Sequence, residues 1–225
     1  MRQINKQEEP IDFIKWKTAN QLAITHLENE KGDKLWDLLP SSLSKEVVEN
    51  DYSKELLRQS LVKEQYYLCC YCNASIKGAP LDTKVEHFLP KEKHKHKAFV
   101  YQNLLAACNG GERVSPVELS CDSRKGDKDP LEYDIISPLV ENVEAHFSYK
   151  EDGKIVGKTE QGKNTIQFLN LDCKRLILSR KAVIEEYLYD ETNDIQLLIS
   201  ELAYPIEGKL QAFCIAIATV LAQYR

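Results

Sequence analysis

The sequence has no apolar run close to the about 20 residues that a membrane-spanning helix needs. Its first residues, MRQINKQEEPIDF, also lack the apolar stretch of a secretory signal. Positive charge is not in excess, because 30 Lys and Arg stand against 35 Asp and Glu, a net charge of −5. Internal repeats and low-complexity tracts are missing as well. These absences predict a cytoplasmic protein without a membrane segment, and they argue against a surface that binds nucleic acid over its whole extent.

What remains is an ordinary globular composition. The chain has 225 residues, of which 43% are hydrophobic and 29% are charged. A chain of this length buries a substantial core, either as one large domain or as a small domain held in a scaffold. Wholesale disorder is excluded by the same proportions.

Periodicity divides the chain into three regions, residues 1–66, 67–131 and 132–225. The first is predicted to be helical, with helices over residues 11–27 and 52–68. After the break at Pro40, a serine in SSLSKEVVEN can cap a further short helix. The middle region is irregular and holds most of the cysteine and histidine.

The third region begins with a predicted β-hairpin and continues as helices. Strand-like stretches flank Asp152-Gly153, a strong turn signal. Helical patterns then follow at residues 164–171, 174–189, 192–202 and 208–224. The predicted fold class is therefore α+β: mainly helical, with a short hairpin and a compact metal-bearing module in the middle.

Seven cysteines are many for a cytoplasmic chain, in which disulfides are disfavoured and clustered thiols indicate metal binding or catalysis. Cys69 and Cys72 form a CxxC pair, although Cys70 offers an alternative register with Cys72. Cys108 and Cys121 can complete a closed four-thiolate site, which would hold a structural zinc. The alternative is a set of unligated buried thiols. Cys173 and Cys214 stand in apolar helical contexts and are predicted to be core residues.

Between the cysteines lies a basic segment, Lys84–Lys97, which reads KVEHFLPKEKHKHK. It holds five lysines and three histidines against two glutamates. Such a segment is either a solvated loop or a contact for phosphates, and its position inside the cysteine cluster favours the second interpretation. His94 and His96 match no motif and are predicted to be solvated.

Three short motifs carry polar groups suited to acid–base or metal chemistry. Glu86 and His87 stand side by side in VEHFLPK, and Asn103 precedes a small apolar strand in YQNLLAACNGG. In SCDSRKGDKDP, Asp122 directly follows the cysteine at 121. Each motif alone is weak evidence, since a histidine beside a carboxylate is more often an ordinary surface residue.

Taken in order, these motifs resemble the HNH endonuclease superfamily, which has a ββα-metal fold. More narrowly, CCYC, VEHFLPK, YQNLLAACNGG and CDSRKGD resemble the HNH subunit of Septu-type and retron-associated antiphage systems. The resemblance implies a metal-dependent nuclease that cuts DNA or RNA. It also implies an SMC- or ABC-like ATPase partner, for which the helices after Pro130 would be the docking surface.

The resemblance also implies a role for each site residue. His87 would be the general base and Asn103 would orient the segment that bears it. Asp122 would ligate a catalytic Mg²⁺ or Mn²⁺, and Glu86 would either be its second ligand or orient His87. The structural zinc would be held by Cys69, Cys72, Cys108 and Cys121, and nucleic-acid phosphates would be bound by Lys91, Arg124 and Lys125.

The chain departs from the superfamily pattern in three places. Many members have aspartate at the position of Glu86, and asparagine or histidine at that of Asp122. The segment between Cys108 and Cys121 is longer than in the simplest members. Two other functions remain open beside the nuclease. One is a non-catalytic zinc module that binds nucleic acid or protein, and the other is an adaptor protein whose helices are tied together by zinc. Neither has a use for Glu86, His87 and Asp122 together.

Overall fold

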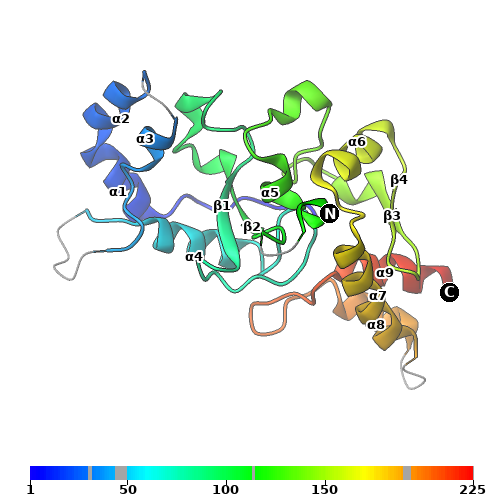
Figure 1. The fold of residues 1–225 in the computed structure, drawn as a ribbon. Coiled ribbons are helices and arrows are strands. Elements are labelled where there is room, and N and C mark those ends of the chain that lie inside the picture. Colours follow the sequence, from blue (N-terminus) through cyan, green and yellow to red (C-terminus); the bar gives the residue numbers. More distant parts are fainter. Residues whose placement is uncertain (30–31, 44–49, 113–114, 190–193, 225) are drawn as a thin grey trace.

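The computed structural model describes residues 1–29, 32–43, 50–112, 115–189 and 194–224. Its architecture is α+β, as predicted, with helices surrounding two small antiparallel sheets (Figure 1). The helices of the first region lie on one side of the larger sheet. Those after residue 160 lie on the other side (Figure 1).

The predicted helix over residues 11–27 is interrupted. The chain forms α1 (Ile11–Ala19) and α2 (Gln21–Leu27), because Asn20 leaves helical geometry and its side-chain amide donates to the Trp16 carbonyl at 2.9 Å. A short helix α3 (Gly32–Trp36) follows. The helix predicted in SSLSKEVVEN falls mostly on residues 44–49, which lie outside the described residues.

Helix α4 (Lys54–Glu64) lies within the range predicted for it but is shorter. Ser53 caps its start by accepting the Leu56 amide at 3.3 Å. The helix ends because Tyr66 and Tyr67 adopt positive φ angles of 52° and 63°, which turn the chain toward the first cysteines. Residues 57, 61 and 62 of α4 are buried, and the helix packs on both strands of the larger sheet.

The larger sheet pairs β1 (Thr83–His87) with β2 (Leu104–Cys108) in antiparallel register, from Thr83 opposite Cys108 to His87 opposite Leu104. All of β2 is buried, as expected for the run LLAAC. The helix α5 (Cys121–Lys125) packs against β2 and follows it in sequence. The order of elements around the predicted site residues is thus strand, strand, helix.

The predicted hairpin is confirmed as β3 (Phe147–Tyr149) and β4 (Ile155–Gly157). Gly153 has a φ of +82° in its turn, and a Cβ there would lie 2.1 Å from the Ile177 carbonyl oxygen. Helices follow as α6 (Glu160–Leu169), α7 (Lys174–Leu188), α8 (Ile195–Glu201) and α9 (Cys214–Leu221). The last is shorter than predicted because residues 206–209 form a tight turn and Phe213 has a φ of +58°.

The buried core is continuous through all three predicted regions. Met1 is fully buried and its amino group donates to the Tyr149 hydroxyl at 2.5 Å, which ties the first residues to the hairpin. Cys173 and Cys214 are buried within this core, as predicted. The boundaries at residues 66 and 131 stay predictions.

Over the part of the chain that the structure describes, no helix combines the length and apolar character that crossing a membrane requires.

Candidate metal centre and catalytic site

Four buried cysteines converge in the middle of the molecule. The Sγ atoms of Cys69, Cys72, Cys108 and Cys121 all lie within 4.8 Å of one another. Cys69 and Cys121 are 3.9 Å apart, and Cys72 and Cys108 are 3.8 Å apart, far beyond a disulfide bond of about 2.05 Å. Four sulfurs around a tetrahedral zinc at about 2.3 Å are separated by roughly 3.8 Å. The cluster therefore fits a structural zinc site.

The first two ligands come from a tight turn. The amide of Cys69 donates to the Ala74 carbonyl at 2.9 Å, and the Asn73 amide donates back to the Cys69 carbonyl at 3.1 Å. Asn73 has a φ of +60°, which asparagine tolerates better than most residues. The turn leaves Cys70 buried but outside the cluster, because its own amide bonds to the Ala106 carbonyl of β2. The register is therefore Cys69 with Cys72.

The other two ligands are brought together by a closed loop. Gly110 has a φ of +61°, and a Cβ there would lie 2.1 Å from the carbonyl oxygen of Ser120. The Ser120 amide donates to the Gly110 carbonyl at 2.9 Å, which closes the loop at its base. The longer segment between Cys108 and Cys121 therefore does not prevent their pairing in the cluster.

The thiols of the cluster share negative charge. Burial opposes ionisation of Cys69, but hydrogen bonds from Cys108 and Cys121 outweigh it and hold the pKa of Cys69 well below its usual value. The Cys108 amide also donates to the Cys69 sulfur at 3.2 Å. The hydrogen bond with Cys121 lowers the pKa of Cys108, but the bonds with Cys69 and Cys72 and burial outweigh it, so the pKa is well above the usual value. Hydrogen bonds with Cys108, Cys69 and Cys72, together with burial, raise the pKa of Cys121 well above the usual value. Zinc would make all four thiolates stable.

Beside this cluster, two carboxyl groups, those of Glu86 and Asp122, line the same cavity. Burial and the charge of Asp122 raise the pKa of Glu86 well above its usual value. Burial opposes ionisation of Asp122 too, but its hydrogen bond with Glu86 and the charges of Lys84 and Lys125 lower its pKa. The two carboxyl groups thus differ in their tendency to ionise, because Glu86 is more deeply buried and lies near the charge of Asp122. Such a pair of oxygen ligands suits a hard divalent cation.

Glu86 is held by internal partners. Its Oε1 accepts the Tyr71 hydroxyl at 2.7 Å and the Lys125 ammonium at 2.9 Å. Glu86 and Lys125 are both almost completely buried. Among the described residues, no hydrogen bond joins the Glu86 carboxylate to the His87 ring. Both roles that were open for Glu86, metal ligand and orienting group for His87, stay predictions.

His87 is buried and neutral. Its Nε2 lies 3.0 Å from the carbonyl oxygen of Ala98, and because a carbonyl only accepts, Nε2 carries the hydrogen and Nδ1 keeps its lone pair. The Trp36 ring packs edge-on against the imidazole, with ring centroids 4.5 Å apart. Burial lowers the pKa of His87 to about 3. The side chain is thus fixed in the tautomer of a proton acceptor.

Asn103 connects the segments on either side of the basic loop. Its Oδ1 accepts the Leu89 amide at 2.8 Å, and its Nδ2 donates to the carbonyls of Leu89 at 3.0 Å and Lys97 at 3.1 Å. The Phe88 amide donates to the Asn103 carbonyl at 3.0 Å. These bonds hold the chain directly after His87. The orienting role of Asn103 stays a prediction.

Replacing Asn103 by alanine should therefore destabilise the protein by roughly 2 kcal/mol, since it leaves three partly buried backbone groups without their partner. Gln102, its exposed neighbour, is the matched control, and Gln102→Ala should change the unfolding free energy by less than about 0.5 kcal/mol. Urea unfolding of the two variants measures the difference. Equal stabilities would mean that Asn103 does not hold the loop.

The predicted residues meet in one polar cavity of about 120 Å³. Glu86, His87, Asp122, Lys91 and Lys125 all line it. Asn103 does not line it but makes hydrogen bonds to the backbone of Leu89 and Lys97 beside it. Trp36 and Asp127, which also line it, were not predicted as site residues. Trp36 comes from α3, about 50 positions before His87, so nothing local in the sequence indicated the contact.

A third residue next to the site that was not predicted is Lys84. Its ammonium lies 3.4 Å from the Asp122 carboxylate and also pairs with Glu112. Side chains two apart on a strand point to the same face, so the position of Lys84 relative to Glu86 was a signal for this contact.

The three residues predicted to bind phosphates differ in their surroundings. Arg124 is exposed on α5, and Lys91 lies at the cavity while pairing with Asp33 at 2.8 Å. Lys125 is 2% exposed and donates to Glu86 and to the His87 carbonyl, so its ammonium group lies inside the site and not at the surface. His94, predicted to be solvated, pairs with Asp129 at 2.5 Å, whereas His96 is exposed.

No family model matches the chain. Several curated proteins are similar to it in sequence. A Septu protein PtuB of Bacillus thuringiensis is 27% identical over 64% of this chain and 53% of its own length. The Escherichia coli protein named "Retron Ec83 putative HNH endonuclease" is 28% identical over 57% of this chain and 64% of its own length. A Septu protein PtuA of Bacillus mycoides is 26% identical over 69% of this chain and 24% of its own length.

The chain thus spans between about half and two thirds of the first two of these relatives. The resemblance indicated by the cysteine, histidine and asparagine motifs is confirmed at modest identity: this chain is similar to the HNH-like proteins of Septu and retron systems.

Proposed function

We propose that this chain is a metal-dependent HNH endonuclease that hydrolyses phosphodiester bonds in DNA or RNA as the effector of an antiphage system. The observation that carries the proposal is the convergence of Glu86, His87 and Asp122 on one polar cavity next to a four-cysteine cluster. In this interpretation β1, β2 and α5 form the ββα-metal module. The names of the relatives support the same reaction class.

His87 is the general base. Its Nδ1 takes a proton from the attacking water, while Nε2–H keeps the ring in place on the Ala98 carbonyl. Burial and the charges of Lys91 and Lys125 disfavour a positive charge on the imidazole and lower its pKa to about 3, while the Ala98 carbonyl and Asp122 act in the opposite direction. Trp36 covers one side of the ring and limits the access of bulk water to it.

Glu86 and Asp122 would hold a Mg²⁺ or Mn²⁺ ion. When bound, the ion would supply charge stabilisation for the scissile phosphate and the leaving oxygen. Lys125 and Lys84 keep this acidic pair compatible with burial by neutralising part of its charge. Lys91 and Arg124 are placed to contact the flanking phosphates of the substrate strand.

The proposed zinc site and the catalytic site are joined by adjacent residues of the chain. Cys121 is a ligand of the cluster and Asp122 follows it at the start of α5. Cys121 has a φ of +55°, a backbone conformation that tertiary structure has to maintain. A zinc ion held by Cys121 would thereby help to keep Asp122 in position.

The partner of the nuclease would be an SMC- or ABC-like ATPase that supplies substrate binding and control. The net charge of −5 supports this, because an acidic chain with a local basic segment binds nucleic acid weakly by itself. The C-terminal region is the proposed docking surface, and it exposes Leu197, Tyr204 and Ile206.

A non-catalytic zinc module is the alternative function. The observation in its favour is the buried ion pair between Lys125 and Glu86, which satisfies Glu86 without a divalent ion. This module would bind nucleic acid or protein and would show no metal-dependent turnover.

Incubation of purified protein with plasmid DNA and with total RNA, in Mg²⁺ or Mn²⁺, distinguishes the two. We expect strand cleavage that EDTA abolishes and that the ATPase partner accelerates. Zinc content measured on the same sample is the control for an intact fold. Zinc-loaded protein that cuts neither substrate under any condition, with or without the partner, would favour the non-catalytic module.

A further inference from the structure

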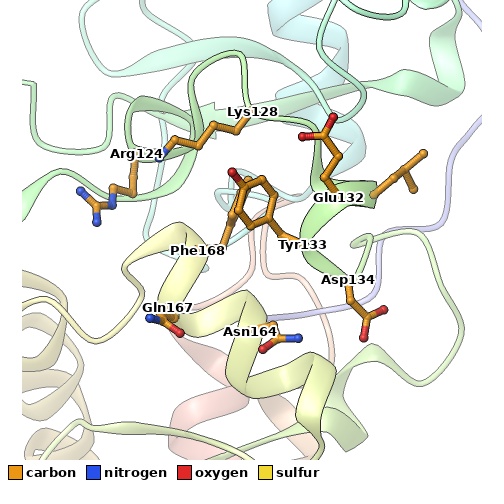
Figure 2. A pocket seen from close by; sticks show the side chains of 9 residues that line it. Arg124, Lys128, Glu132, Tyr133, Asp134, Asn164, Gln167 and Phe168 are labelled. Atoms are coloured by element: carbon orange, nitrogen blue, oxygen red, sulfur yellow. The ribbon is translucent and has the colours of Figure 1, made fainter.

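A larger cavity, of about 530 Å³, lies between α6 and the segment that follows α5, including the 3-10 turn η4 (Pro130–Tyr133). Figure 2 shows its side chains. Arg124 and Lys128 come from one wall and Asn164 and Gln167 of α6 come from the other, with the Tyr133 ring between them. The volume is that of an ordinary small-molecule or cofactor site. Of the residues that line this cavity, only Arg124 has a part in the function proposed above.

An aromatic pair forms the middle of the cavity. The ring centroids of Tyr133 and Phe168 are 4.8 Å apart, and the planes are tilted by 46°. Phe168 is half-buried and supports Tyr133, which remains 47% exposed. A supported, exposed aromatic ring is a stacking surface for another flat group, and nucleobases use such surfaces in single-strand binding proteins.

The polar groups around the ring suit the rest of a nucleotide. The Arg124 guanidinium and the Lys128 ammonium are cations that bind phosphate. The amides of Asn164 and Gln167 both donate and accept, as the edge of a base requires. The two acidic residues of the cavity already have partners: Glu132 pairs with Lys93 at 2.7 Å, and Asp134 accepts the Gln161 amide at 2.7 Å.

This cavity is separated from the catalytic cavity by a single turn. Asp127 lines the catalytic cavity, and Lys128, the next residue, lines this one. Gly126 opens the turn with a φ of +56°, and a Cβ there would meet no atom within 4 Å. A nucleic-acid strand that occupies the catalytic cavity can therefore pass over this turn. A further hollow of about 490 Å³ shares Arg124 and Gln167 and extends the path along α6.

We infer that the cavity is a subsite for one unpaired nucleotide of the substrate strand, with its base stacked on Tyr133 and its phosphate held by Arg124 and Lys128. The inference rests on the proposed nuclease function and names its substrate class as single-stranded nucleic acid. In a duplex, both faces of a base are covered by neighbouring bases, so none is free to stack on Tyr133.

Fluorescence anisotropy of the full chain with labelled oligonucleotides tests the inference. Single-stranded DNA, single-stranded RNA and the matching duplex are compared without added divalent metal, so that no strand is cut. Tyr133→Ala should weaken binding of single strands about ten-fold, the loss expected for one stacked base. Tyr133→Phe keeps the stacking ring and should bind like the parent protein. Tyr189→Ala, which removes a tyrosine that is 78% exposed at the end of α7, is the matched control.

The inference is overturned if Tyr133→Ala binds single strands as tightly as the parent protein does, or if duplex binding falls by the same factor. Melting temperatures of all variants identify a loss caused by misfolding. The nuclease assay gives an independent result. Binding that depends on Tyr133, without cleavage, would support the subsite and contradict the nuclease function. Cleavage without Tyr133-dependent binding would support the nuclease function and contradict the subsite.

Discussion

Replacing Cys121 by alanine is expected to remove zinc from the protein and to lower its melting temperature by at least about 10 °C. Zinc binding contributes roughly 10–16 kcal/mol to the folding of small zinc domains, which is as large as the whole stability of most domains. The cluster ties the turn at Cys69–Cys72 to the end of β2 and to the start of α5. Loss of one ligand therefore releases all three segments.

Cys173→Ala is the matched control for this prediction. Cys173 is also buried, but it lies at the start of α7 and outside the cluster. Its replacement should keep one zinc per chain and cost only about 1 kcal/mol. Metal analysis and thermal unfolding of both variants measure the effect. Full zinc content in Cys121→Ala, or an equal loss of stability in Cys173→Ala, would contradict a structural zinc at the cluster.

The ligand set was predictable because its chemistry is local in the sequence. The CxxC spacing indicated Cys69 and Cys72, and the register that Cys70 left open was decided only by the turn that includes Asn73. Asp152-Gly153 predicted the hairpin for the same reason, since a two-residue turn signal needs no distant partner. Buried strands such as LLAAC were likewise recognisable from composition.

Long-range contacts were not predictable in this way. The packing of Trp36 on His87 and the burial of Lys125 beside Glu86 depend on how α3 and α5 meet the sheet. A lysine next to an arginine in a sequence indicates a surface cation, and only the fold reveals that one of the two points inward. The break at Asn20 and the late start of α9 similarly follow from side-chain capping and from turns that override periodicity.

The second large effect is expected at His87. His87→Ala removes the proton acceptor and should slow cleavage by about 10²–10⁴-fold. The fold should persist, because among the described residues the imidazole makes one hydrogen bond, to the Ala98 carbonyl. The zinc cluster does not include His87, so one zinc per chain should remain. His26→Ala, which removes an exposed histidine on α2, is the matched control and should cleave at the parent rate.

The decisive measurement is the rate of strand cleavage by zinc-loaded His87→Ala. The parent protein and His26→Ala are measured beside it, on the substrate that the parent cuts. We expect metal-dependent cleavage by the parent and by His26→Ala, and a rate at least about 100-fold lower for His87→Ala. Cleavage by His87→Ala at the parent rate, with zinc bound and the melting temperature unchanged, would contradict the proposed role of His87 and place the chemistry at another site.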